Sequence, residues 1–192
     1  MATVLVPIAP GCEELEAVTV IDLLRRAQIE VVVAGLEAGA ITASRGTVLL
    51  PDITLDQALS RDYDMIVLPG GQPGATHLQN DERIAQLLLR MANEGKFTAA
   101  ICAAPKALAT AGILDDKRST GYPGTLTRDE FPKIHIESGA IVTDGNVVTS
   151  RGPGTAMDFA LALIELLQGK QNRDTVEQAL ARPPEHVGIP LN

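Results

Sequence analysis

Short runs of aliphatic residues alternate along the chain with longer segments in which apolar residues recur every three or four positions. Continuous runs bounded by glycine or proline are typical of buried strands, and the periodic segments are typical of amphipathic helices. The pattern predicts buried strands at residues 3–9, 29–36, 64–68 and 97–101. It predicts helices at residues 13–27, 81–93, 103–111, 155–167 and 173–181.

Two pairs of shorter apolar segments predict hairpins. Residues 41–43 and 47–50 flank Ser44-Arg45-Gly46, which indicates a hairpin or an excursion at a sheet edge. Residues 140–143 and 146–149 flank Asp144-Gly145, a dipeptide that favours a two-residue hairpin turn. The tail from Pro183-Pro184 onward is predicted to be irregular.

The order of these elements indicates the fold class. Residues 3–36 form a strand–helix–strand unit, and the alternation continues without a repeat or a linker. We therefore predict one doubly wound α/β domain over residues 1–192, with a mostly parallel sheet and helices on both faces. Such sheets need aliphatic side chains, and only 3% of the residues are aromatic. Ligands of these folds bind at the carboxyl ends of the strands.

Charge and cysteine content exclude several functional classes. The net charge of -8 and the lack of a basic run argue against nucleic-acid binding by a basic face. No apolar run approaches the roughly 20 residues that span a bilayer, and the first residues do not resemble a signal peptide. Cys12 and Cys102 lie far apart, which favours reduced thiols over a disulfide framework or a zinc site. We expect a cytoplasmic protein.

The strongest chemical signal is an apolar strand that ends in a cysteine. Residues 97–101 lead directly into Cys102, which is followed by Ala103-Ala104-Pro105 and a predicted helix. This is the layout of a nucleophile elbow, in which small neighbours permit a sharp turn. The dipole of the helix would favour the reactive thiolate. The alternative is an ordinary buried cysteine, and the local pattern does not separate the two.

Two other strand ends should reach the same edge of the sheet. The segment after the first strand carries Glu13, Glu14 and Glu16, which point in different directions on a helix. One of them could be the proton partner of a thiol, and the others would be charges near the helix N-terminus. Gly70-Gly71 could offer backbone N–H groups to an oxyanion, or could form an ordinary turn.

The remaining polar residues give weaker signals. The three histidines show no metal-ligand spacing and are expected at the surface: His77, His135 and His186. Cys12 is expected to be a packed or loop thiol. Arg45 and Arg151 both occur in a Ser-Arg-Gly sequence and are either turn residues or guanidinium groups that bind an anion.

Six ordered segments together resemble the ThiJ/PfpI superfamily, in the branch of the parkinsonism-associated deglycase and YajL. They are residues 10–18, 21–27, 44–46, 67–71, 99–105 and 149–155. The resemblance covers nearly the whole chain. It implies a flavodoxin-like domain with a nucleophile elbow, and so favours the elbow at Cys102 over a packed cysteine.

The resemblance also implies roles for single residues. Cys102 would be the reactive thiol, and Glu16 a protonated carboxyl that hydrogen-bonds the thiolate. The backbone N–H groups of Gly71 and Ala103 would face an oxyanion, beside Gly70.

An anion-binding edge would be formed by Arg45 with Arg26 of a neighbouring subunit, so a homodimer is implied. Many relatives carry a histidine where this chain has Tyr122. A tyrosine donates a hydrogen bond but is a poor base at neutral pH, so Glu16 would carry the proton transfers.

The activity implied by the resemblance is that of a cysteine-dependent glyoxalase or protein deglycase with a role in oxidative stress. Methylglyoxal, glyoxal or early glycation adducts would be the substrates, and no cofactor or metal would be needed. The first alternative is a redox sensor or oxidation-activated chaperone that uses the same thiol. The second is a protease-like or amidase-like hydrolase, which the missing histidine disfavours.

Overall fold

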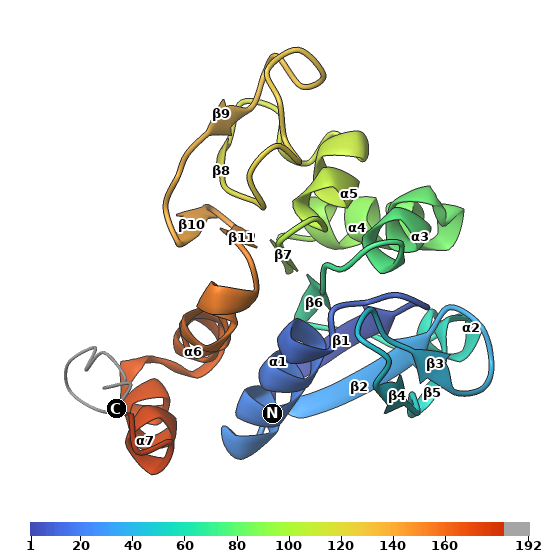
Figure 1. The fold of residues 1–192 in the computed structure, drawn as a ribbon. Coiled ribbons are helices and arrows are strands. Elements are labelled where there is room, and N and C mark those ends of the chain that lie inside the picture. The colour runs from blue at the N-terminus through green and yellow to red at the C-terminus, as the bar shows by residue number, and fades with distance from the viewer. Residues whose placement is uncertain (183–192) are drawn as a thin grey trace, which may run out of the picture.

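A seven-stranded sheet in the order β10-β11-β7-β6-β1-β2-β5 forms the centre of the computed structural model, which describes residues 1–182 (Figure 1). Neighbouring strands are parallel, except that β10 is antiparallel to β11. The strands are β1 (Thr3–Ile8), β2 (Glu30–Gly35), β5 (Ile53–Thr54), β6 (Met65–Leu68), β7 (Phe97–Ile101), β10 (Ile141–Asp144) and β11 (Val147–Ser150). The predicted doubly wound, mostly parallel α/β sheet is confirmed.

Helices cover both faces of this sheet. One face packs against α1 (Glu14–Arg26) and α6 (Ala156–Gln168), and α7 (Lys170–Ala179) packs against α6. The other packs against α2 (Leu55–Ala58), α3 (Gly74–Asn80), α4 (Glu82–Asn93) and α5 (Pro105–Thr110). A short 3-10 turn, η1 (Pro153–Thr155), precedes α6.

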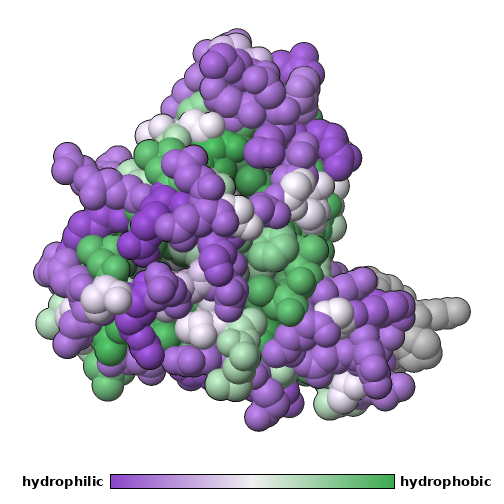
Figure 2. All heavy atoms as spheres, turned by 180° about the vertical axis from the view of Figure 1, so that it is seen from behind, coloured by the Kyte–Doolittle hydropathy of each residue, from purple (hydrophilic) through white to green (hydrophobic). Residues whose placement is uncertain are grey.

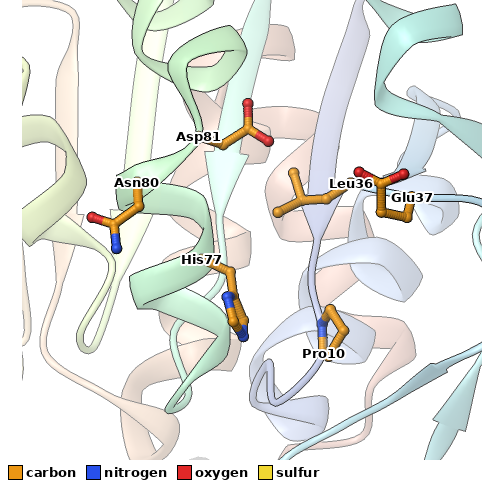
Figure 3. A pocket seen from close by; sticks show the side chains of 6 residues that line it. All are labelled: Pro10, Leu36, Glu37, His77, Asn80 and Asp81. Atoms are coloured by element: carbon orange, nitrogen blue, oxygen red, sulfur yellow. The ribbon is translucent and has the colours of Figure 1, made fainter.

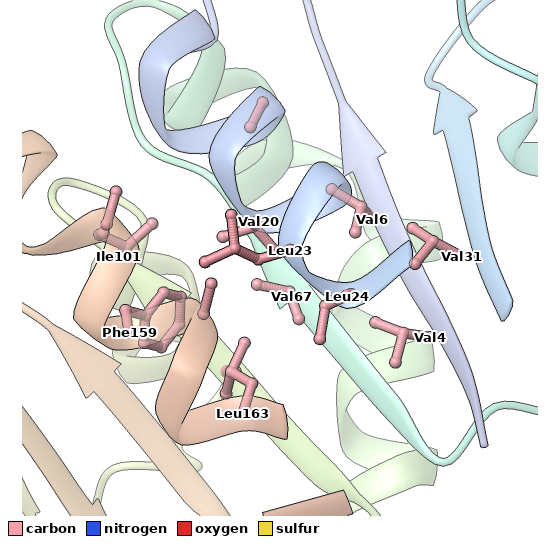
Figure 4. Close-up of a cluster of buried hydrophobic side chains, with 14 of the residues drawn as sticks. Val4, Val6, Val20, Leu23, Leu24, Val31, Val67, Ile101, Phe159 and Leu163 are labelled. Atoms are coloured by element: carbon pink, nitrogen blue, oxygen red, sulfur yellow. The ribbon is translucent and has the colours of Figure 1, made fainter. Parts of the chain in front are cut away.

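Successive strand residues divide between two hydrophobic cores. In β1, Val4 and Val6 face α1 and α6, and Leu5 faces the opposite helices. Figure 4 shows the first core, in which α1 and α6 contribute side chains such as Leu23 and Phe159. This packing holds α1 against the sheet.

Several short elements were not predicted from the pattern. Helix α2 is stabilised by a capping box between Thr54 and Gln57, and α3 is separated from α4 by Asp81 alone. A parallel pair, β8 (Arg118–Ser119) and β9 (His135–Ile136), lies in the segment expected to be loose. Helix α7 begins and ends earlier than predicted. The irregular tail expected from Pro183 lies outside the described residues.

The 41–50 hairpin forms a separate two-stranded sheet of β3 (Ile41–Thr42) and β4 (Val48–Leu49). No helix within residues 1–182 has both the length and the apolar character needed to cross a bilayer. Figure 2 shows a largely hydrophilic face with apolar areas between the polar groups.

Candidate functional site

Strand β7 ends in a sharp turn at Cys102. The cysteine has a φ of 64°, which is uncommon for any residue other than glycine, and α5 begins shortly afterwards at Pro105. Two backbone hydrogen bonds fix this turn: Cys102 N donates to the Ser150 oxygen at 2.9 Å, and Tyr122 N donates to the Cys102 oxygen at 2.7 Å. The strand–turn–helix geometry of a nucleophile elbow is therefore present.

Glu16, in the first turn of α1, brings a carboxyl group to this elbow. It is fully buried, and Gly70 N donates to its Oε2 at 2.7 Å. The thiol of Cys102 lies close enough to the carboxyl group to affect its pKa. Its Oε1 is buried without a partner among residues 1–182. Of the three acids at the start of α1, Glu16 is the one that faces the thiol.

Gly70 and Gly71 allow three segments to meet at the site. A Cβ atom on Gly70 would lie 2.7 Å from Cys102 Cβ and 2.8 Å from Glu16 Oε2. Gly71 has a φ of 88°, and a Cβ there would lie 2.3 Å from the backbone nitrogen of Glu13. Any side chain at either position would push the loops apart, so the close approach requires glycine.

The electrostatics of the pair differ from the sequence prediction. Burial raises the pKa of Glu16 to about 7, although hydrogen bonds from Gly70 and Cys102 oppose the shift. Burial, and then the charge of Glu16, raises the pKa of the Cys102 thiol to about 12, against the N–H groups of Ala103 and Gly71. The prediction that the helix dipole alone favours a thiolate at Cys102 is therefore wrong. Because the two groups are coupled, the first proton is lost by the pair rather than by either residue, and a thiolate forms when the remaining proton lies on Glu16.

The second cysteine and the two described histidines have no role in the proposed site. Cys12 is fully buried, and burial raises the pKa of its thiol to about 11, as befits a packed cysteine. His77 and His135 are exposed. His186 lies outside the described residues.

The two arginines of the expected anion-binding edge lie apart in the chain. Arg45 is exposed on the turn between β3 and β4, and its backbone N–H donates to Glu14 Oε1 at 3.0 Å. Arg26 lies at the opposite end of α1 from Glu16 and pairs with Asp22 at 2.7 Å. A single chain therefore does not bring Arg26 to Cys102.

Tyr122 contributes its backbone to the site more than its side chain. Its backbone N–H donates a hydrogen bond to the Cys102 carbonyl oxygen, but 53% of the residue is exposed to solvent. The ring lies beside Gly152, where an added Cβ atom would be 3.4 Å from Tyr122 Cδ2.

We expect Tyr122→Phe to change the rate of Cys102 alkylation by less than about twofold, because the residue is exposed and loss of its hydroxyl leaves no buried partner unsatisfied. Iodoacetamide labelling followed by mass spectrometry measures this rate. A tenfold loss would assign the hydroxyl a role at the sulfur.

A separate cavity of about 350 Å³ lies at the carboxyl ends of β1 and β2 (Figure 3). Its lining residues are Pro10, Leu36, Glu37, His77, Asn80 and Asp81. Neither Cys102 nor Glu16 lines it, so it is distinct from the thiol site.

Comparisons with known proteins agree with this geometry. Protein dj-1beta of Drosophila melanogaster is 42% identical over 177 residues, which cover 92% of this chain and 95% of the relative. The crystal structure of Drosophila DJ-1beta superposes with a TM-score of 0.90 at 40% identity, covering 95% of this chain and 98% of that one. The glutathione-independent glyoxalase DJR-1.2 of Caenorhabditis elegans is 30% identical, over 93% of this chain and 95% of the relative.

The family profile extends over nearly all of the described chain. A sequence profile of the DJ-1/PfpI family matches residues 2–166, which include the elbow, Glu16 and both glycines. The match agrees with the resemblance found in the six sequence segments. The chain belongs to the DJ-1/PfpI family.

Proposed function

We propose that this protein is a cysteine-dependent glyoxalase that converts methylglyoxal or glyoxal to a hydroxy acid without glutathione. The observation that carries the proposal is the buried Glu16 carboxyl, with a pKa of about 7, in contact with the Cys102 thiol. A relative that is named as a glutathione-independent glyoxalase supports the same activity.

The geometry suggests a complete reaction. The Cys102 proton passes to Glu16, and Sγ attacks the aldehyde carbon to form a hemithioacetal, whose oxyanion lies near the N–H groups of Gly71 and Ala103. Glu16 gives this proton to the oxyanion, and the carboxylate so formed then moves a proton from the former aldehyde carbon to the neighbouring carbon through an enediol, while the hydroxyl proton passes to the neighbouring oxygen. The first carbon is oxidised and the second reduced, which leaves a thioester. Water cleaves it to lactate, or to glycolate from glyoxal, and the thiol returns.

The same attack on an early glycation adduct would release the amine and make the protein a deglycase. Sγ would displace the amine from the hemiaminal carbon of such an adduct, a proton from Glu16 would leave with the amine, and the same hemithioacetal would form. A glycated peptide incubated with a scavenger of free dicarbonyl separates direct repair from removal of the free aldehyde.

Lactate formation from methylglyoxal in a buffer without glutathione tests the activity. Native protein should form lactate, and protein alkylated at Cys102 should not. Cys102 is 8% exposed, and the alkylation step itself shows whether a small reagent reaches the sulfur. Equal rates before and after alkylation would exclude the proposal.

We also propose that the protein forms a homodimer through α1 and the β3–β4 hairpin. Leu15 and Val18 of α1 are exposed, as are Val48 and Leu50 of the hairpin, although all four are apolar. A second copy would cover this patch. It could also bring its Arg26 to the anion-binding edge that Arg45 begins.

Val18→Asp is expected to raise the dimer dissociation constant at least about tenfold, because each copy would bury an unpaired charge. Leu89→Asp is a matched control, since Leu89 is 44% exposed on α4 and Val18 is 46% exposed on α1. Light scattering over a dilution series measures both. A native protein that stays monomeric at high concentration would rule out the dimer.

Oxidation of Cys102 is a second candidate function, consistent with a redox sensor or an oxidation-activated chaperone. Oε1 of buried Glu16, which has no partner within residues 1–182, could donate a proton to a sulfinate oxygen, and the N–H groups of Gly71 and Ala103 face the same sulfur. Two equivalents of hydrogen peroxide would oxidise the thiol to sulfinate and release water. Intact mass should show two added oxygens on Cys102 before any on Cys12.

Both cysteines are free thiols, which supports a cytoplasmic location. An amidase-like or protease-like activity is disfavoured, because the site contains no histidine among residues 1–182.

A further inference from the structure

The turn that carries Arg45 is bound to α1 by the side chain of Glu14. Both carboxylate oxygens of Glu14 accept hydrogen bonds from Arg45 N, at 3.0 and 3.1 Å. Thr47 N donates to Oε1 at 3.2 Å, and Ser44 Oγ lies 3.0 Å from Oε2 and 2.8 Å from Glu13 Oε2. The Glu14 carboxylate therefore accepts hydrogen bonds from three residues of the turn.

The carboxylate supplies acceptors that the hairpin itself lacks. Within the hairpin, Gly46 N donates to the Ala43 oxygen and Ala43 N to the Thr47 oxygen. The N–H groups of Arg45 and Thr47 find no acceptor within the hairpin, and both donate to the Glu14 carboxylate. Burial alone would raise the pKa of Glu14, but these donors, with its own N–H and Ser44, lower the pKa to about 2. The side chain is thus an anion at neutral pH.

The same turn is tied to the backbone beside the thiol site. Ser44 N donates to the Cys12 oxygen at 2.8 Å, and Glu13 N donates to the Gly70 oxygen at 2.9 Å. Gly70 in turn contacts both Glu16 and Cys102. The contacts therefore connect the turn, through the backbone of Cys12, Glu13 and Gly70, to Glu16 and Cys102.

We propose that Glu14 is a positioning residue that fixes the turn of Arg45, and thereby holds the guanidinium group where it attracts anionic reactants to the Cys102 site. The inference rests on the anion-binding role proposed for Arg45. Glu14 itself touches no reacting atom. It acts by restricting the turn to one conformation.

The charge selectivity of Cys102 alkylation tests this inference without any need for turnover. Iodoacetate and iodoacetamide attack the same sulfur and differ chiefly in charge, so the ratio of their rate constants reports the local potential. A well-placed arginine should raise this ratio about threefold at low salt, and less at high salt.

The sign of the change separates positioning from simple electrostatics. If Glu14 acted only as a charge, Glu14→Gln would remove a negative group and raise the iodoacetate ratio. If it holds Arg45 in place, the ratio should fall to the value of Arg45→Gln, and the double variant should fall no further. Hydrogen exchange at the amides of Arg45 and Thr47 should accelerate in Glu14→Gln.

Glu82→Gln is a matched control, because Glu82 is the first residue of α4 as Glu14 is of α1, and it is exposed. The ratio of the iodoacetate to the iodoacetamide rate constant in Glu82→Gln should equal that of the native protein. A ratio that stays constant or rises in Glu14→Gln would overturn the inference even if methylglyoxal is converted. A ratio that is unaffected by Arg45→Gln would overturn both the inference and the role proposed for Arg45.

Discussion

Replacing Cys102 by serine is expected to lower the rate of lactate formation from methylglyoxal at least about 1000-fold, because the hydroxyl is a far weaker acid and nucleophile than a thiol. The elbow, the Gly71 amide and Glu16 would all remain in place. A carboxylate with a pKa near 7 can take a proton from a thiol more readily than from an aliphatic alcohol. The loss should therefore appear in kcat.

The matched control for this change is Cys12→Ala, in the other buried cysteine. Its side chain is packed in the core on the α1 side of the sheet and is not in the proposed mechanism. We expect its kcat/KM to remain within about twofold of native, although the protein should be less stable by about 1 kcal/mol. Comparable turnover by native and Cys102→Ser protein would show that the sulfur is not the nucleophile.

The sequence predicts the elbow because its chemistry and its fold depend on the same local pattern. An aliphatic strand, one cysteine, two alanines and a proline specify a buried strand, a sharp turn and a helix start. The long periodic segments that became α1, α4 and α6 were also predicted, because each buries one continuous face.

Features set by distant contacts were not predictable in this way. The three acids at the start of α1 look equivalent in sequence, yet Glu16 is buried against Gly70 while Glu14 binds the 44–47 turn. Only the fold brings Ser44 to this helix. The elevated pKa of Cys102 likewise depends on burial and on Glu16, which lies far away in sequence. Short elements such as α2 and β8 bury too few residues to leave a periodic pattern.

Glu16→Gln is expected to reduce turnover about 100-fold and to change the pH dependence of Cys102 alkylation. In the native protein the pair should lose its first proton near pH 7, where Glu16 titrates. The resulting anion is shared with the sulfur, so alkylation should rise with pH up to about 7 and then level off.

In Glu16→Gln the thiol must lose its proton alone. Removal of the Glu16 charge lowers the pKa of Cys102 from about 12, but burial, the larger cause, remains, so the pKa should stay above the usual value of 9.0. At pH 7 the alkylation rate should then lie within about threefold of native, because glutamine and protonated Glu16 are both neutral neighbours of the thiol. The rate in the variant should still be rising at pH 9, where the native rate has levelled off.

The amide oxygen introduced by Glu16→Gln would still accept the hydrogen bond from Gly70 N–H, so the loop should remain folded. Glu82→Gln, in an exposed first-turn acid, should leave the pH profile unchanged. A profile that levels off near pH 7 in Glu16→Gln as well would mean that the group titrating there is not Glu16. The proton path of the proposed reaction would then need another residue.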